Sequence, residues 1–137
     1  MSFFERYFAA LDGPDPFSSL DLVADEVRFS ILWSDEASTA EFVGGREDLR
    51  RFIEAGDDWR GWRHHVLWSA QDGDTEFASG ETRYDDGRKI GTYVVFAQLD
   101  PEGRMIRYMA ARTPVANFRT LEGDRLQSEV APAGDGV

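Results

Sequence analysis

Three turn sequences divide the second half of the chain into four apolar or alternating runs. The turns are "QDGD" at 71–74, "DDGR" at 85–88 and "DPEG" at 100–103. They separate the runs "WRHHVLWSA", "TEFASGETRY", "KIGTYVVFAQL" and "RMIRYMAAR". Asp-Gly pairs between β-rich runs are among the stronger short-range signals for a β-hairpin. The pattern therefore predicts an antiparallel meander of four strands between residue 62 and about residue 113.

The start of the chain has helical spacing instead. Ser2 followed by Glu5 is a capping-box pattern, and aromatic and leucine residues recur every three or four positions over 3–11. The Gly-Pro pair at 13–14 ends this helix. A second short helix follows, with Asp-Pro at its start, and reaches about residue 23.

The period changes to two before the middle of the chain. Val27, Phe29, Ile31 and Trp33 alternate with polar residues, which predicts a strand with one buried face. The polar segment "SDEASTAEF" predicts a loop or an irregular hairpin, and "GGREDLRRFIEAG" predicts a third helix. Helices followed by a meander favour an α+β domain in which three N-terminal helices pack on one face of a strongly curved antiparallel sheet. The concave side, closed by the helices, would form an internal pocket.

Length and charge narrow the classes of function. The 137 residues fit one domain, which we place at 1–120, followed by a weakly packed acidic tail at 121–137. The net charge of -11 argues against nucleic acid as a partner, because it repels phosphate. The start lacks a basic segment followed by an apolar run, so we expect no signal peptide, no membrane span and a cytoplasmic protein. The absence of cysteine excludes disulfides and thiolate chemistry.

Four segments carry a resemblance to a known superfamily: "ERYFAALDGPD" in the first helix, "VADEVRFSI" in the first strand, "GGREDLRRFI" in the third helix and "LDPEGRMIRYM" near the end. Together they resemble the NTF2-like superfamily, and within it the SnoaL-like and ketosteroid-isomerase-like branch. The resemblance covers about residues 2–112. It implies a cone-shaped domain, often dimeric, with a cavity for a hydrophobic molecule. Members include isomerases, cyclases, dehydratases, epoxide hydrolases and non-catalytic modules, so the fold alone does not choose a function.

The resemblance also implies positions for steroid-isomerase chemistry. That pattern places a tyrosine on the first helix, an aspartate base on the first strand and a second acid on the penultimate strand, around a developing enolate. Tyr7 matches the tyrosine, but the two acidic positions fall on Ile31 and Val95. The aspartate of epoxide hydrolase and cyclase relatives is also missing, since residues 110–112 read Ala-Ala-Arg.

Strand alternation, counted back from "QDGD", assigns side chains to the two faces of the sheet. It turns His65 inward and His64 outward, together with the outward Val66 and Trp68. The residues expected on the concave face are Arg63, His65, Leu67, Ser69, Phe77, Ser79, Glu81, Arg83, Tyr93, Val95, Ala97, Tyr108 and Arg112. A one-residue bulge would exchange the two faces.

On this register His65 and Glu81 are neighbours on adjacent strands. A buried carboxylate raises the pKa of a neighbouring histidine and orients one ring nitrogen, which suits a general acid or base. The alternative is a satisfied polar cluster, with Arg83, that has no catalytic role. Asp35, near the pocket mouth, is a second candidate base or else part of a solvated turn. The residues expected to contact a ligand are Tyr7, Ile31, Trp33, Asp35, Tyr93, Val95, Tyr108 and Arg112.

Two hypotheses for function remain. The first is a cofactor-independent acid-base isomerase, cyclase or hydratase acting on a hydrophobic, polyketide- or steroid-like ligand, with His65 moving the proton, Glu81 orienting it and Tyr7 polarising an oxygen. The second is a non-catalytic ligand-binding or dimerisation domain. We expect no metal, because adjacent strand residues such as His64 and His65 point apart. We also expect a homodimer, since outward apolar residues need to be covered.

Overall fold

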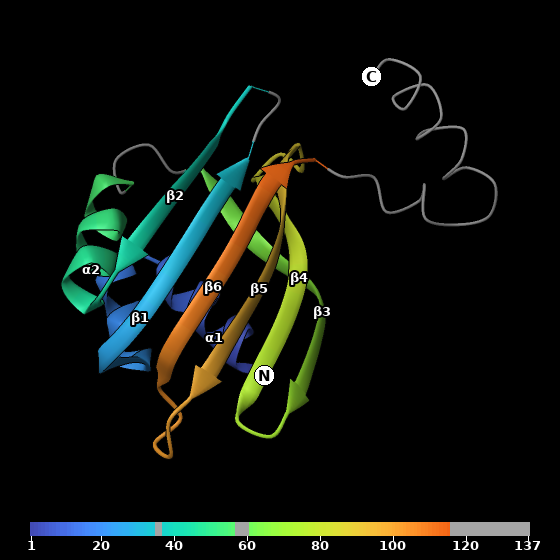
Figure 1. The fold of residues 1–137 in the computed structure, drawn as a ribbon. Coiled ribbons are helices and arrows are strands. Elements are labelled where there is room, and N and C mark those ends of the chain that lie inside the picture. Colours follow the sequence, from blue (N-terminus) through green and yellow to red (C-terminus); the bar gives the residue numbers. More distant parts are fainter. Residues whose placement is uncertain (35–36, 57–60, 116–137) are drawn as a thin grey trace, which may run out of the picture.

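One six-stranded sheet curls around the N-terminal helices (Figure 1). The computed structural model describes residues 1–34, 37–56 and 61–115. Its elements in chain order are α1 (Phe3–Leu11), the 3-10 helix η1 (Pro16–Leu22), β1 (Val23–Ser34), β2 (Thr39–Gly44), α2 (Arg46–Ala55), β3 (Trp62–Asp72), β4 (Thr75–Tyr84), β5 (Lys89–Leu99) and β6 (Met105–Pro114). Within these residues no helix is both long and apolar enough to cross a membrane.

The sheet is mixed, with strand order β2-β1-β6-β5-β4-β3. The meander from β3 to β6 is antiparallel, as the turn sequences predicted. However, β6 pairs with β1 in parallel, so the prediction of a wholly antiparallel sheet was wrong. This pairing places the first strand of the chain beside the last strand that the structure describes.

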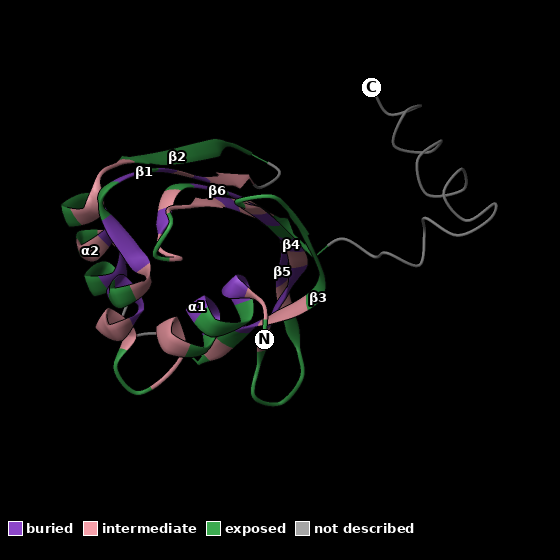
Figure 2. Ribbon diagram, turned by 90° about the horizontal axis from the view of Figure 1, so that it is seen from below, coloured by how far each residue is buried: buried purple, intermediate pink, exposed green. Residues whose placement is uncertain are grey.

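The helices cover the concave face of the sheet (Figure 2). α1 begins at the predicted capping box, in which Ser2 Oγ accepts from the Glu5 amide at 3.2 Å. Its inward residues Phe3, Phe4, Tyr7 and Phe8 are buried and form the centre of the core. The aromatic spacing read from the sequence therefore corresponds to the face of α1 that packs against the sheet.

The shorter elements agree with the sequence patterns in part. α2 forms where "GGREDLRRFIEAG" predicted a helix, and residues 39–44 form β2, a hairpin partner of β1. The second predicted helix is a 3-10 helix rather than an α-helix. The tail predicted at 121–137 and the candidate base Asp35 lie outside the described residues.

Candidate functional site

A β-bulge in β3 decides which histidine faces the core. Val66 pairs with Gly80 but Trp68 pairs with Ser79, so Leu67 is the extra residue between two pairs. On the turn side of the bulge, Ser69 lies opposite the buried Ala78 and so belongs to the concave face, which is the face predicted for Ser69. On the other side the faces are exchanged.

The prediction for the two histidines was therefore wrong. His64 lies opposite the buried Thr82 on the concave face, and only 1% of its side chain is exposed. His65 lies opposite Glu81 on the other face of the sheet and is only partly buried. The alternation rule is correct on either side of the bulge, but the extra residue resets the count.

The prediction for β4 was wrong for a different reason. Asp72 pairs with Thr75 across a two-residue turn, and this pairing determines which residues of β4 face the core. The buried concave residues of β4 are Glu76, Ala78, Gly80 and Thr82, whereas Phe77, Ser79, Glu81 and Arg83 belong to the other face. On β5 and β6 the prediction was correct, since Tyr93, Val95, Ala97 and Tyr108 are buried.

His64 is held by a carboxylate on one side and by a guanidinium on the other. Its Nδ1 lies 3.1 Å from both carboxylate oxygens of Asp12, and its backbone amide donates to Asp12 Oδ2 at 2.7 Å. Its Nε2 lies 2.7 Å from Nη2 of Arg112. Asp12 is the C-cap residue of α1, and Arg112 lies near the end of β6. Three distant segments of the chain thus meet at one imidazole.

Aromatic rings fix the orientation of the His64 imidazole. The ring of Phe8 stacks on it with a centroid distance of 4.0 Å and an angle of 2° between the planes. Trp62 and Tyr93 meet it edge-on, at 5.2 Å and 5.4 Å. Packing on several sides and hydrogen bonds at both nitrogens leave the imidazole one orientation.

The contact with Arg112 also fixes the position of the ring proton. A guanidinium can only donate hydrogen bonds, so Nε2 of His64 must accept and must carry a lone pair. The proton of the neutral ring is then on Nδ1, where it is donated to Asp12. The structure is that of an Asp⁻, a neutral histidine and an Arg⁺ in a row.

Tyr93 completes this group, which we call the His64 cluster (Asp12, His64, Tyr93 and Arg112). Tyr93 pairs with Arg112 between β5 and β6 and with Gly80 between β5 and β4. A Cβ at Gly80 would lie 2.6 Å from the Tyr93 hydroxyl, so glycine leaves the space that this hydroxyl occupies. Burial raises the pKa of Tyr93, which keeps the phenol protonated and able to donate.

Glu81 and His65 are cross-strand neighbours, but Glu81 binds other partners. Arg83 and Lys89 donate to its two carboxylate oxygens, with Arg83 Nε at 2.8 Å and Lys89 Nζ at 3.3 Å. Burial raises the pKa of Glu81, but these hydrogen bonds outweigh burial and hold its pKa below the usual range. Burial, with a contribution from Arg83, lowers the pKa of His65. The expected rise in the histidine pKa beside a carboxylate is therefore reversed.

The other predicted ligand-contacting residues fall into two groups. Tyr7, Ile31, Val95 and Tyr108 are packed in the core. Trp33 is half-buried and lies opposite Arg112 in the β1–β6 pairing. Burial raises the pKa of Tyr108, against a smaller opposing effect of Arg112.

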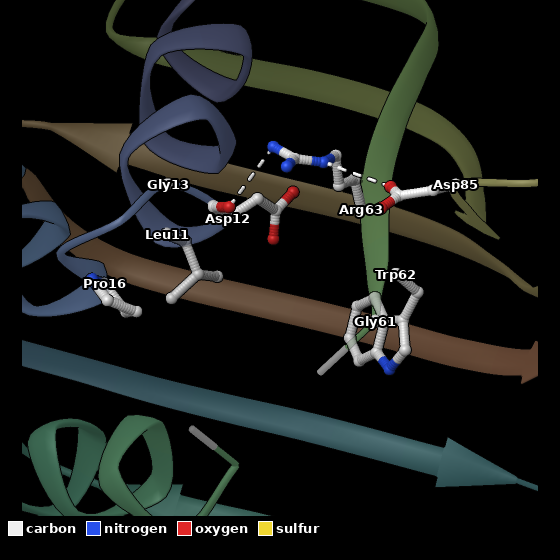
Figure 3. Close-up of a pocket in the computed structure, with 8 residues that line it drawn as sticks. All are labelled: Leu11, Asp12, Gly13, Pro16, Gly61, Trp62, Arg63 and Asp85. Atoms are coloured by element: carbon white, nitrogen blue, oxygen red, sulfur yellow. Dashed lines mark hydrogen bonds and ion pairs between the residues drawn. The ribbon is translucent and has the colours of Figure 1, made fainter. Parts of the chain in front are cut away.

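A small pocket adjoins the His64 cluster at the C-terminal end of α1 (Figure 3). Its volume is about 130 Å³, below the roughly 300–1,000 Å³ of most ligand pockets. Arg63 extends across it, with Nη1 3.4 Å from the backbone oxygen of Asp12 and Nε 3.5 Å from Asp85. Leu11, Pro16 and Trp62 contribute its apolar wall. Because Asp12 lines the pocket and also binds His64, it connects the pocket to the buried cluster.

In the part of the chain that the structure describes, no three His, Cys, Asp or Glu side chains come together as a metal site requires. The side chains of the His64 cluster can themselves transfer a proton and stabilise charge.

The sequence analysis missed two members of the cluster. Asp12 was not singled out, although a carboxylate directly after an amphipathic helix can reach a neighbouring strand. His64 was assigned to the wrong face because the bulge at Leu67 leaves no mark in the sequence. Arg112 and Tyr93 were placed correctly on the concave face.

Comparison with known proteins supports the fold. No model of a known family matches the sequence, and the sequence finds no match among curated proteins. The fold is similar to that of a candidate isomerase of the SnoaL-like family from Agrobacterium tumefaciens, with 19% identity, a TM-score of 0.61 and coverage of 80% of this chain and 93% of that one. A candidate ketosteroid isomerase from Kribbella flavida is 24% identical, with a TM-score of 0.58 and coverage of 84% and 77%.

A third similar structure is IdmH, a candidate polyketide cyclase from Streptomyces antibioticus, at 12% identity. Its TM-score is 0.62, and the match covers 80% of this chain and 88% of IdmH. At these low identities the similarity shows a shared fold. The fold expected from the resemblance to the NTF2-like superfamily is therefore confirmed, and function has to be argued from the site.

Proposed function

We propose that this chain catalyses cofactor-independent proton transfer on a small carbonyl compound, as an isomerase or cyclase, with His64 as the acid-base group. The observation that carries the proposal is the imidazole held between Asp12 and Arg112 on the concave face. The structural neighbours named as candidate isomerases and a candidate polyketide cyclase support the same class of reaction. The role first assigned to His65 and Glu81 thus passes to a different pair.

The lone pair on His64 Nε2 is the basic site. A substrate that draws Arg112 aside exposes Nε2, which takes a proton from the carbon next to the carbonyl. The electrons of the broken C–H bond move onto the carbonyl oxygen and form an enolate. Asp12, which accepts from Nδ1, stabilises the imidazolium that results. Return of the proton to a different carbon completes an isomerisation.

The proposal is tested by proton exchange in D₂O. β-Tetralone is a small ketone with acidic α-protons, and their replacement by deuterium is followed by NMR. We expect exchange well above the buffer rate, and a loss of about 10²–10⁴-fold in His64→Gln, which removes the base. The adjacent His65→Gln is the matched control and should exchange as the parent does, because His65 faces the other side of the sheet. Parent exchange at the buffer rate, or an equal loss in both variants, would contradict the proposal.

A non-catalytic dimerisation domain is the second candidate, favoured by an apolar surface. The convex side of the sheet carries what we call the outer sheet face (Trp68, Phe77, Val94, Phe96 and Met109), whose register aligns it across four strands. Four of these residues are large and exposed, and Trp68 is 55% exposed. The outward position predicted for Trp68 is confirmed, whereas Val66 packs against the core.

We propose that a second copy of the chain covers the outer sheet face. A hollow of about 560 Å³ lies beside this face, and Phe96 also lines it. Glu26, Arg28 and Arg107 lie around the hollow. A surface that carries both signs of charge can pair with itself about a two-fold axis, which is the geometry of most homodimers.

A further inference from the structure

Two hydrogen-bond donors in the His64 cluster are buried without a partner among the described residues. They are Oη of Tyr93 and Nε of Arg112. Tyr93 is 1% exposed, and its raised pKa keeps its proton in place. A buried donor that makes no hydrogen bond costs free energy, so such groups in native proteins usually have a role or a partner that binds later.

These donors belong to two side chains that are neighbours on the concave face. Tyr93 and Arg112 are directly opposite each other between β5 and β6, so their side chains leave the sheet on the same side. Gly80, on the far side of Tyr93, leaves the hydroxyl room that any other residue would fill. The positive charge of Arg112 lies close enough to act on the ionisation of the Tyr93 hydroxyl. A phenol and a guanidinium are both donors, and the ligand they share is an acceptor.

We infer that Tyr93 and Arg112 form a binding site for an anionic oxygen on a planar carbon framework, such as a carboxylate or an enolate. The charge on Arg112 selects an anion over a neutral carbonyl, and hydrogen bonds to a charged acceptor are stronger than those to a neutral one. The remaining acidic group of the cluster, Asp12, lies on the opposite side of the imidazole, at Nδ1. Repulsion between the ligand and Asp12 is thereby reduced.

Binding at this site also changes the state of His64. Arg112 now donates Nη2 to His64 Nε2 at 2.7 Å. An anionic oxygen is a stronger acceptor for a guanidinium than a neutral imidazole nitrogen. Arg112 therefore turns towards the ligand and uncovers Nε2. The anion that binds and the base that acts on it are coupled through one arginine side chain.

This inference rests on the proposed function for the use of His64, but anion binding can be measured without any reaction. Benzoate serves as the carboxylate probe, 4-nitrophenolate as the enolate-like probe and benzamide as the uncharged comparison, each titrated by calorimetry. We expect both anions to bind more tightly than benzamide. Tighter binding of 4-nitrophenolate than of benzoate would assign the site to an enolate, and the reverse order to a carboxylate of the substrate.

Conservative variants identify the two donors. Tyr93→Phe removes only the hydroxyl, and Arg112→Lys keeps the charge but removes Nε and the planar fork. Each should weaken anion binding by about tenfold or more, the size expected for a hydrogen bond to a charged group. Arg107→Lys, on the same strand but exposed, should leave binding unchanged. Unchanged binding in Tyr93→Phe and Arg112→Lys, or no anion binding by the parent, would overturn the inference.

A measurement on the parent protein keeps the test decisive if a variant does not fold. Benzoate should shift the side-chain Nε–H resonance of one arginine and the ring nitrogen resonances of His64, which loses its bond to Arg112. Anion binding without ketone exchange would support this site and refute the proposed function. Ketone exchange without Arg112-dependent anion binding would do the opposite.

Discussion

At the residue scale, the two adjacent histidines have opposite environments. His64 is fixed in the core by Asp12, Arg112 and stacked aromatic rings, whereas His65 lies on the other face beside Glu81 and Arg83. A single extra residue at Leu67 produces this difference. The histidine that the alternation rule selected is the one whose pKa is lowered, and it has no place in the His64 cluster.

The pKa of His65 should lie below its ordinary value of 6.5 in the folded protein, because burial first and then Arg83 disfavour the charged form. The unfolded chain therefore binds more protons near this pH. The free energy of unfolding should rise with pH across the window just below about 6.5. The contribution of His65 to stability is lost as the pH falls through this window. The chemical shifts of the His65 ring protons against pH measure the midpoint, and His65→Gln identifies the resonances. A midpoint above the ordinary value of 6.5 would contradict this prediction.

The sequence could place Tyr93 and Arg112 because β5 and the end of β6 are regular up to those residues. It could not place His64, since the face that His64 occupies depends on a bulge that no residue type signals. It could not pair Asp12 with His64 either, because the contact spans 52 positions and depends on how α1 lies over the sheet. The sequence identified polar residues of the candidate site, but it could not predict which of them form hydrogen bonds with one another.

At the scale of elements, a buried carboxylate anchors α1 to the sheet. Glu76 of β4 accepts from the backbone amide of Phe3 with both oxygens, at 3.0 Å and 3.1 Å. Glu76 is itself buried, and its charge lies at the positive end of the helix dipole. The bond orients the helix whose far end carries Asp12, so it contributes indirectly to the geometry of the site.

Substitutions at Glu76 should therefore reduce stability in a graded way. Glu76→Gln keeps an acceptor and loses the charge, and we expect a loss of about 1 kcal/mol in the free energy of unfolding. Glu76→Ala leaves the Phe3 amide without this partner and should cost about 2–3 kcal/mol. Urea denaturation measures both, with the exposed Glu102→Gln as the control. Equal losses in the two variants would contradict the graded effect, because they would show that a neutral acceptor at residue 76 contributes nothing.

Local patterns predicted most elements and missed what depends on distant pairing. The capping box and the aromatic spacing gave α1 its observed range, and the turn sequences gave the four strands of the meander. The segment 16–22 forms a 3-10 helix, which differs from an α-helix by one position in the hydrogen-bond pattern and has no distinct sequence signal here. The parallel contact of β1 and β6 could not be read locally, because it joins strands about 80 positions apart.

At the scale of the whole molecule, association should depend on the outer sheet face. Phe77→Glu puts a charge into that apolar surface and should weaken dimerisation by at least about tenfold. Ala9→Glu adds the same charge on the exposed side of α1 and is the matched control. Sedimentation velocity over a range of concentrations measures the equilibrium. A monomeric parent protein would contradict the proposed dimer.

The net charge of the chain also predicts how salt affects dimerisation. Each copy carries a formal charge of -11, so two copies repel each other over distances of about a Debye length. Added salt screens this repulsion and should tighten the dimer, since the contact itself is largely apolar. If salt instead weakened association, ion pairs such as those available to Glu26 and Arg28 would dominate the interface.

The pairing of β1 with β6 also has a consequence for how the chain is made. During synthesis β1 leaves the ribosome about 80 residues before its partner β6, which begins at Met105. Until then the β2–β1 pair is not joined to strands β3 to β5, and both parts of the sheet leave a strand edge uncovered beside the aromatic helix α1. Contacts of this length slow folding and leave apolar surface exposed to aggregation. The last strand both supplies Arg112 and joins the two halves of the sheet, so a nascent chain that stops short of it has neither a complete sheet nor the site.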